Sequence, residues 1–88
     1  MRVTAELSLY PLEQAYLQVI ETAIMRLRRA AGIEIVVNQM SSQIRGELAD
    51  VMAAIEGLLA ESFAAGQPQS LVVKILNADL PIGETPDV

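Results

Sequence analysis

The spacing between hydrophobic residues changes along this chain, and the order of these changes restricts the fold more than any other feature. Residues 2–9 alternate, with an apolar side chain at every second position, which is the pattern of a strand with one buried face. Hydrophobic residues then recur every three or four positions, as they do along one side of a helix. These two patterns predict strands at 2–9, 33–37, 40–45 and 70–76, and helices at about 12–31 and 47–64.

Residues with strong backbone preferences mark the ends of both helices. Tyr10-Pro11 is expected to end the first strand, because proline cannot donate to a ladder but suits the first turn of a helix. Gly32 is expected to close the first helix, and Gly46 to open the second. The first helix should bury Leu17, Ile20, Ile24, Leu27 and Ala31, and the second Leu48, Val51, Met52, Ile55, Leu59 and Phe63.

The order of the elements, βαββαβ, favours one arrangement. Each helix is amphipathic and needs an apolar surface to cover, and crossover connections are right-handed. We therefore expect an α+β, ferredoxin-like sandwich, with an antiparallel sheet in the order 4-1-3-2 and both helices on one face. Residues 1–76 would form this single domain. Residues 77–88, with two prolines, a glycine and three acids, would form a C-terminal tail.

The face of the sheet that lacks helices is expected to be polar at its centre and apolar towards its outer strands. Such a mixture suits a partly covered surface, so we expect contact with another subunit over a polar site. In the third strand, Met40, Ser42 and Ile44 should lie on the opposite face. The residues expected on the open face are Thr4, Glu6, Ser8, Val36, Asn38, Ser41, Gln43, Arg45, Val72, Lys74 and Leu76.

The composition argues against several classes of function. The 88 residues carry a formal net charge of -5, which disfavours nucleic acid because phosphate binding requires clustered Lys and Arg. Cys and His are absent, which removes disulfides, thiol nucleophiles, the usual zinc sites and imidazole general bases. No apolar run approaches the roughly 18 residues of a membrane span, and no signal peptide is recognised. A cytoplasmic location is the default expectation.

Three segments carry a resemblance to a known family. They are residues 3–12, Val-Thr-Ala-Glu-Leu-Ser-Leu-Tyr-Pro-Leu; residues 38–47, Asn-Gln-Met-Ser-Ser-Gln-Ile-Arg-Gly-Glu; and the pair Val51-Met52. With the order of elements, they make the chain similar to the thiamine-binding, YkoF-like family over about residues 3–76. The resemblance implies self-association through sheets and binding of thiamine or its hydroxymethylpyrimidine part. YkoF has two such domains in one chain, so a homodimer or homotetramer is expected here.

The predicted ligand-binding residues combine this resemblance with the chemistry of the open face. Glu6 would pair with a ring nitrogen or the cationic ring, although a cross-strand pair with Arg45 or Lys74 is an equal alternative. The serines would bind the pyrimidine or satisfy nearby backbone groups. Tyr10 would stack on a ring or pack at the strand–helix junction. Asn38 fits a turn better than a ligand contact. The full set is Glu6, Ser8, Tyr10, Asn38, Ser41, Ser42 and Arg45.

A non-catalytic carrier or sensor of thiamine or hydroxymethylpyrimidine is the leading interpretation. The alternative is a protein-interaction or assembly module without a small-molecule ligand, because ferredoxin-like domains host many functions. An ACT-like regulatory domain that binds an amino acid is a third reading. An enzyme built on Glu6 and Arg45 would need a buried Glu6 with a raised pKa. No catalytic residue, metal ligand or cofactor beyond the bound ligand is predicted.

Overall fold

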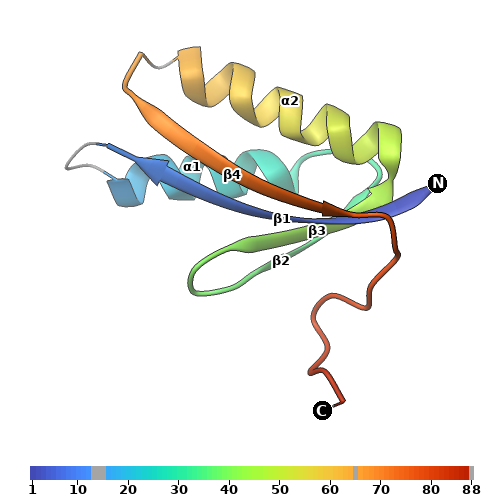
Figure 1. The fold of residues 1–88 in the computed structure, drawn as a ribbon. Helices are drawn as coiled ribbons and strands as arrows, with labels where there is room; N and C mark the ends of the chain where they lie inside the picture. Colours follow the sequence, from blue (N-terminus) through green and yellow to red (C-terminus); the bar gives the residue numbers. More distant parts are fainter. Residues whose placement is uncertain (13–15, 65, 88) are drawn as a thin grey trace.

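The two hydrophobic patterns produce the expected succession of strands and helices. A computed structural model describes residues 1–12, 16–64 and 66–87. The four strands form one antiparallel sheet in the order β2-β3-β1-β4, with both helices on one face (Figure 1). The predicted α+β sandwich and its strand order are therefore confirmed. The elements are β1 (Arg2–Pro11), α1 (Tyr16–Arg28), β2 (Ile33–Val37), β3 (Ser42–Glu47), α2 (Leu48–Ala64) and β4 (Gln69–Leu76).

The core lies between the sheet and the two helices. Alternate residues of β1 point into it, and Ile44 of β3 and Val51 of α2 are fully enclosed. The buried apolar residues are Val3, Ala5, Leu7, Ala23, Leu27, Ile44, Val51, Ala54, Ile55 and Leu58.

The buried side of each helix agrees with the prediction only in part, because Leu27, Val51 and Ile55 are buried as expected but other predicted residues are not. Ala23, Ala54 and Leu58 are also buried, although none of them was predicted to be. In α2 the buried positions are 51, 54, 55 and 58, a regular helical stripe. The prediction of buried side chains was therefore wrong for Leu17, Ala31, Leu48, Met52 and Phe63, all of which are exposed.

Several predicted boundaries also differ. β1 continues through Tyr10 to Pro11, which proline tolerates there because β1 pairs on one side only beyond Leu7. Met40 lies in the β2–β3 turn and is 88% exposed, so its predicted burial in a strand was wrong. Gly46 lies within β3, and α2 begins at residue 48. Residues 13–15, where the first predicted helix begins, lie outside the described residues.

Gly46 has no room for a side chain, which gives a test of the packing. A Cβ atom there would lie 2.6 Å from the carbonyl oxygen of Gly32, a backbone atom that cannot turn aside. We predict that Gly46→Ala lowers the free energy of unfolding by about 1–3 kcal/mol, the usual penalty for overpacking an interior, as measured by urea unfolding.

Gly57→Ala is the matched control for this change. A Cβ at Gly57 would meet the guanidinium end of Arg26, a flexible side chain that can move. Alanine also improves helix propensity by up to about 1 kcal/mol. Equal destabilisation by the two substitutions would contradict the packing described for Gly46.

Candidate functional site

The open face of the sheet carries the polar side chains of β1 and β3, as predicted. Pairing on both sides of β1 places Glu6 between Gln43 of β3 and Lys74 of β4. Thr4 lies two residues along β1, opposite Arg45. Three strands therefore bring carboxylate, amide, ammonium, hydroxyl and guanidinium groups onto one surface.

Glu6 is the centre of a small hydrogen-bonded group. Lys74 Nζ lies 2.8 Å from its Oε1, and Ser41 Oγ donates to its Oε2 over 3.2 Å. The hydrogen bond from Lys74, followed by that from Ser41, lowers the pKa of Glu6 below its ordinary value. The same contact raises the pKa of Lys74. Glu6 is therefore an anion at neutral pH, and its side chain is 32% exposed.

A shallow pocket of about 350 Å³ lies against this group. Its walls combine the charged pair Glu6–Lys74 and the amide of Gln43 with two leucines, Leu76 at the end of β4 and Leu80 beyond it. A few convergent polar groups beside apolar walls are typical of small-molecule sites. We call this space the Glu6 pocket. Its lining residues are Thr4, Ala5, Glu6, Gln43, Lys74, Ile75, Leu76 and Leu80.

The segment that follows β4 crosses the open face, and we call residues 77–83 the strap (Figure 1). Thr4 is buried and holds the strap twice, because its Oγ1 donates to Ala78 O over 2.7 Å and accepts from Leu80 N over 2.9 Å. Farther along, a Cβ at Gly83 would contact Val36 of β2 at 3.2 Å. The strap thus runs from β4 over β1 towards β2 and supplies one wall of the Glu6 pocket.

Arg45 fastens the strap from the β3 side. Its Nε lies 2.8 Å from Oε2 of Glu34, and its Nη1 donates to Leu80 O over 2.5 Å. The hydrogen bond with Glu34 raises the pKa of Arg45. Arg2 adds an ion pair to Asp79 at 3.1 Å. The cross-strand pair of Glu6 is therefore with Lys74, while Arg45 pairs with Glu34 and the strap.

Ser8, Asn38, Ser41 and Ser42, all predicted site residues, line a second hollow near the β2–β3 turn. This hollow lies between that turn and α1, and its volume is about 100 Å³. Asn38 N donates to Ser41 O over 2.7 Å, which closes the turn, so the turn role considered for Asn38 is present. Ser42 is buried on the helix side of the sheet, whereas Ser41 reaches Glu6 on the open face.

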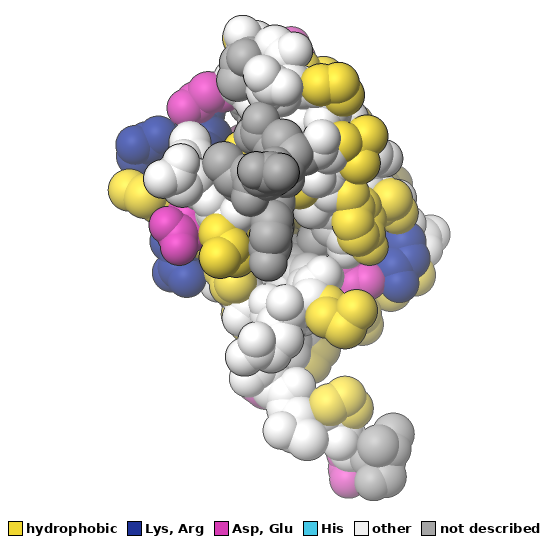
Figure 2. Space-filling view, turned by 90° about the vertical axis from the view of Figure 1, so that its left-hand side faces the viewer, with side chains coloured by type: hydrophobic (Ala, Val, Ile, Leu, Met, Phe, Trp, Pro, Cys, Tyr) yellow, Lys and Arg dark blue, Asp and Glu magenta, His cyan; other side chains and the backbone are white. Residues whose placement is uncertain are grey.

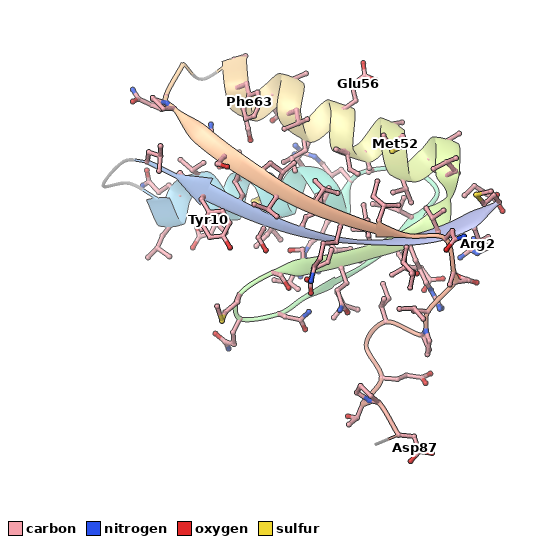
Figure 3. The ribbon with its side chains drawn as sticks, in the orientation of Figure 1. Arg2, Tyr10, Met52, Glu56, Phe63 and Asp87 are labelled. Atoms are coloured by element: carbon pink, nitrogen blue, oxygen red, sulfur yellow. The ribbon has the colours of Figure 1, made fainter. Side chains whose placement is uncertain are left out.

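The predicted residues therefore do not all converge on one site. Ser41 contacts Glu6 and also lines the hollow by the turn with Ser8, Asn38 and Ser42, whereas Arg45 lies beneath the strap. Tyr10 is 52% exposed, at the far end of β1 from Arg2 (Figure 3). Leu80 was missed, because nothing in residues 77–88 predicts contact with the sheet. Gln43 and Lys74 were expected on this face but were not proposed as ligand contacts.

Two negative findings apply to the described residues. No cluster of three His, Cys, Asp or Glu side chains there is arranged to hold a metal ion. None of the helices described combines the length and hydropathy needed to cross a membrane.

Comparisons with known proteins agree on the fold. A family model described as "YKOF-related Family" matches residues 2–75. A Streptococcus pneumoniae protein, SP2199, is 22% identical, with a TM-score of 0.82 over 91% of this chain and 90% of that one. A Thermotoga maritima protein provisionally assigned to thiamine biosynthesis or salvage is 19% identical, with a TM-score of 0.75 over 85% and 82% of the two chains.

A domain of unknown function from Bacillus cereus, DUF77, gives a TM-score of 0.76 at 20% identity, over 89% of this chain and 77% of that one. No curated protein matches the chain. At these identities the solved structures establish a shared fold.

The attachment of the strap predicts the effect of a near-isosteric change. Thr4→Val removes the hydroxyl that bonds to Ala78 O and Leu80 N but keeps the shape of the side chain. We expect faster hydrogen exchange at the Leu80 amide and a loss of about 1–3 kcal/mol in the free energy of unfolding. Thr22→Val, at an exposed position of α1, is the control. Unchanged protection of Leu80 would show that Thr4 does not hold the strap.

The lowered pKa of Glu6 predicts how its contacts contribute to stability as pH changes. Because the folded-state pKa lies below the ordinary value of 4.5, this contribution is full above the unfolded-state pKa and is lost as pH falls through the folded-state pKa. The stability difference between the unmodified chain and Glu6→Gln should therefore be constant near neutral pH and shrink below pH 4.5. Urea unfolding across that range measures it, with Glu56→Gln as the charge control. If the stability difference between the unmodified chain and Glu6→Gln already disappears at a pH above 4.5, that result would contradict the lowered pKa of Glu6.

Proposed function

Because this chain belongs to the YKOF-related family, we propose that it binds thiamine or its hydroxymethylpyrimidine part, without catalysis, in the Glu6 pocket. The observation that carries the proposal is the anionic Glu6 at the middle of the open face, within reach of a hydroxyl, an amide and two leucines. The name of the Thermotoga maritima neighbour, which refers to thiamine biosynthesis or salvage, supports the choice of ligand.

The chemistry of thiamine suits these groups. Its thiazolium ring carries a positive charge that a carboxylate attracts, and its aminopyrimidine offers N–H donors and ring-nitrogen acceptors. Glu6 accepts hydrogen bonds, Gln43 both donates and accepts, and the leucines provide a surface for the flat rings. The pocket volume of about 350 Å³ lies at the small end of the range for ligand sites.

Lys74 would compete with a cationic ligand for the carboxylate of Glu6, and such a ligand would displace it. Its side chain is 77% exposed, so its ammonium can move into water when Glu6 takes another partner. A neutral hydroxymethylpyrimidine would instead bind beside the intact pair. Loss of Lys74 should therefore strengthen thiamine binding and leave hydroxymethylpyrimidine binding nearly unchanged.

A binding role fits these residues better than a catalytic one. A general base works best with a pKa near the operating pH, whereas the pKa of Glu6 is lowered. Glu6 is also partly exposed rather than desolvated. The sequence contains neither His nor Cys to serve in its place. The Glu6–Arg45 enzyme considered from the sequence would need the opposite shift in pKa.

Exposed apolar surface favours an assembly module as the second candidate. Met52 and Phe63 on α2 flank a shallow hollow of about 470 Å³, and β4, an edge strand, exposes Val72 and Ile75. Hydrophobic side chains form a column on the side of the molecule where β4 lies (Figure 2). Such a surface suits a second copy of this chain, and we include a homodimer or homotetramer in the proposal.

Calorimetric titration with thiamine and with hydroxymethylpyrimidine tests the proposal. Glu6→Gln should weaken thiamine binding by about tenfold or more, because a charge-assisted contact is lost. Ser41→Ala should weaken it less, and Lys74→Met should strengthen thiamine binding alone. Glu56→Gln on α2, on the other layer of the sandwich, is the matched control and should bind normally (Figure 3).

The same titrations separate the two candidates. An absence of heat with millimolar amounts of either compound, together with concentration-dependent self-association by light scattering, would favour the assembly module. Equal affinities of Glu6→Gln and Glu56→Gln for thiamine would move the site away from Glu6.

A further inference from the structure

The Glu6 pocket is lined by two successive rows of side chains across the sheet. In the first, which we call the polar row, Glu6 lies between Gln43 of β3 and Lys74 of β4. In the second, which we call the strap row, Thr4 lies opposite Leu76 of β4. Side chains two positions apart on a strand share a face and lie about 7 Å from each other. The pocket therefore offers two separate places for a ligand to make contact.

The strap makes the second row apolar. The hydroxyl of Thr4 donates to Ala78 O over 2.7 Å and accepts from Leu80 N over 2.9 Å, so it is committed to the strap. These bonds hold Leu80 beside Thr4, where Leu80 lines the pocket together with Leu76. The two leucines remain 44% and 46% exposed, respectively. A ligand that covers them gains the free energy of burying apolar surface.

The charged groups around the strap are engaged elsewhere. Asp79 accepts from Arg2 over 3.1 Å, and Arg45 bonds to Glu34 and to Leu80 O. Asp79 and the two arginines are not among the described residues that line the pocket. The strap therefore contributes an apolar contact, and a charged ligand has its ionic partner in the polar row.

We propose that Leu80 is a specificity-determining residue, through which the Glu6 pocket prefers a cation with two linked rings over a one-ring compound. One ring lies in the polar row, and a second ring, joined by a single methylene as in thiamine, covers Leu80 about 7 Å away. Hydroxymethylpyrimidine has one ring, finds its hydrogen-bond partners in the polar row and leaves Leu80 in water. Thr4 is a positioning residue, because it acts through Leu80.

This inference rests on the proposed function and chooses between its two ligands. It concerns residues beyond 2–75, the part of the chain that the family model matches, so membership of the family does not itself assign the strap a role.

Calorimetric titration of Leu80→Ala with both compounds tests the proposal. The affinity for thiamine should fall about fivefold, because much of an apolar contact is lost, whereas the affinity for hydroxymethylpyrimidine should change less than about twofold. Leu17→Ala is the matched control, since it removes a leucine that is 60% exposed on α1 and does not line the pocket. It should bind both compounds as the unmodified chain does.

Two variants of Thr4 test its positioning role. Thr4→Val removes the bonds that hold Leu80 and should weaken thiamine binding about as much as Leu80→Ala, again sparing hydroxymethylpyrimidine. Thr4→Ser keeps the hydroxyl and should restore thiamine binding, a rescue that general destabilisation by Thr4→Val would not explain. If Thr4→Val does not fold, Leu80→Ala still decides.

Equal weakening of the two ligands by Leu80→Ala, or unchanged binding of thiamine, would overturn the role of Leu80 while the thiamine site at Glu6 stands. If the unmodified chain binds neither compound, the proposed function and this inference both fail.

Discussion

The structure depends on β1, a single strand that is paired along both edges. Its buried residues Val3, Ala5 and Leu7 bind it to the core, and its pairing with β3 and β4 fixes the register of both neighbours. A slip of one residue would turn these three side chains towards water, so the register is strongly determined. The position of Glu6 between Gln43 and Lys74 follows directly from it. The open-face site is thus a consequence of the same alternation that builds the core.

The strap gives the Glu6 pocket a wall that the sheet alone would not provide. By bonding to Thr4 and Arg45, it covers one end of the open face and leaves the row through Glu6 accessible. It also brings Leu80 to the edge of the Glu6 pocket. A flat sheet surface becomes a hollow with a charged floor and an apolar wall, which is the form a small-molecule site requires.

The sequence predicted those features that depend on local pattern. The alternation in β1 and the βαββαβ order were sufficient for the fold, the strand order and the exposure of Glu6 on the open face. The burial of Ala23 and Ala54 was missed, because side chains this small do not stand out in a hydrophobic stripe. The strap and the pairing of Arg45 depend on tertiary contacts between residues far apart in sequence, for which residues 77–88 give no signal. The preference of Glu6 for Lys74 over Arg45 likewise required the register.

The central claim is that thiamine binds against Glu6 on the open face, and intermolecular nuclear Overhauser effects test it most directly. Spectra of the labelled protein with bound thiamine would show which protons lie next to the ligand. We predict contacts from the ligand to the side chains of Gln43 and of the leucines at 76 and 80, which surround the carboxylate. Contacts confined to the hollow at the β2–β3 turn, or to the helix layer, would contradict the account.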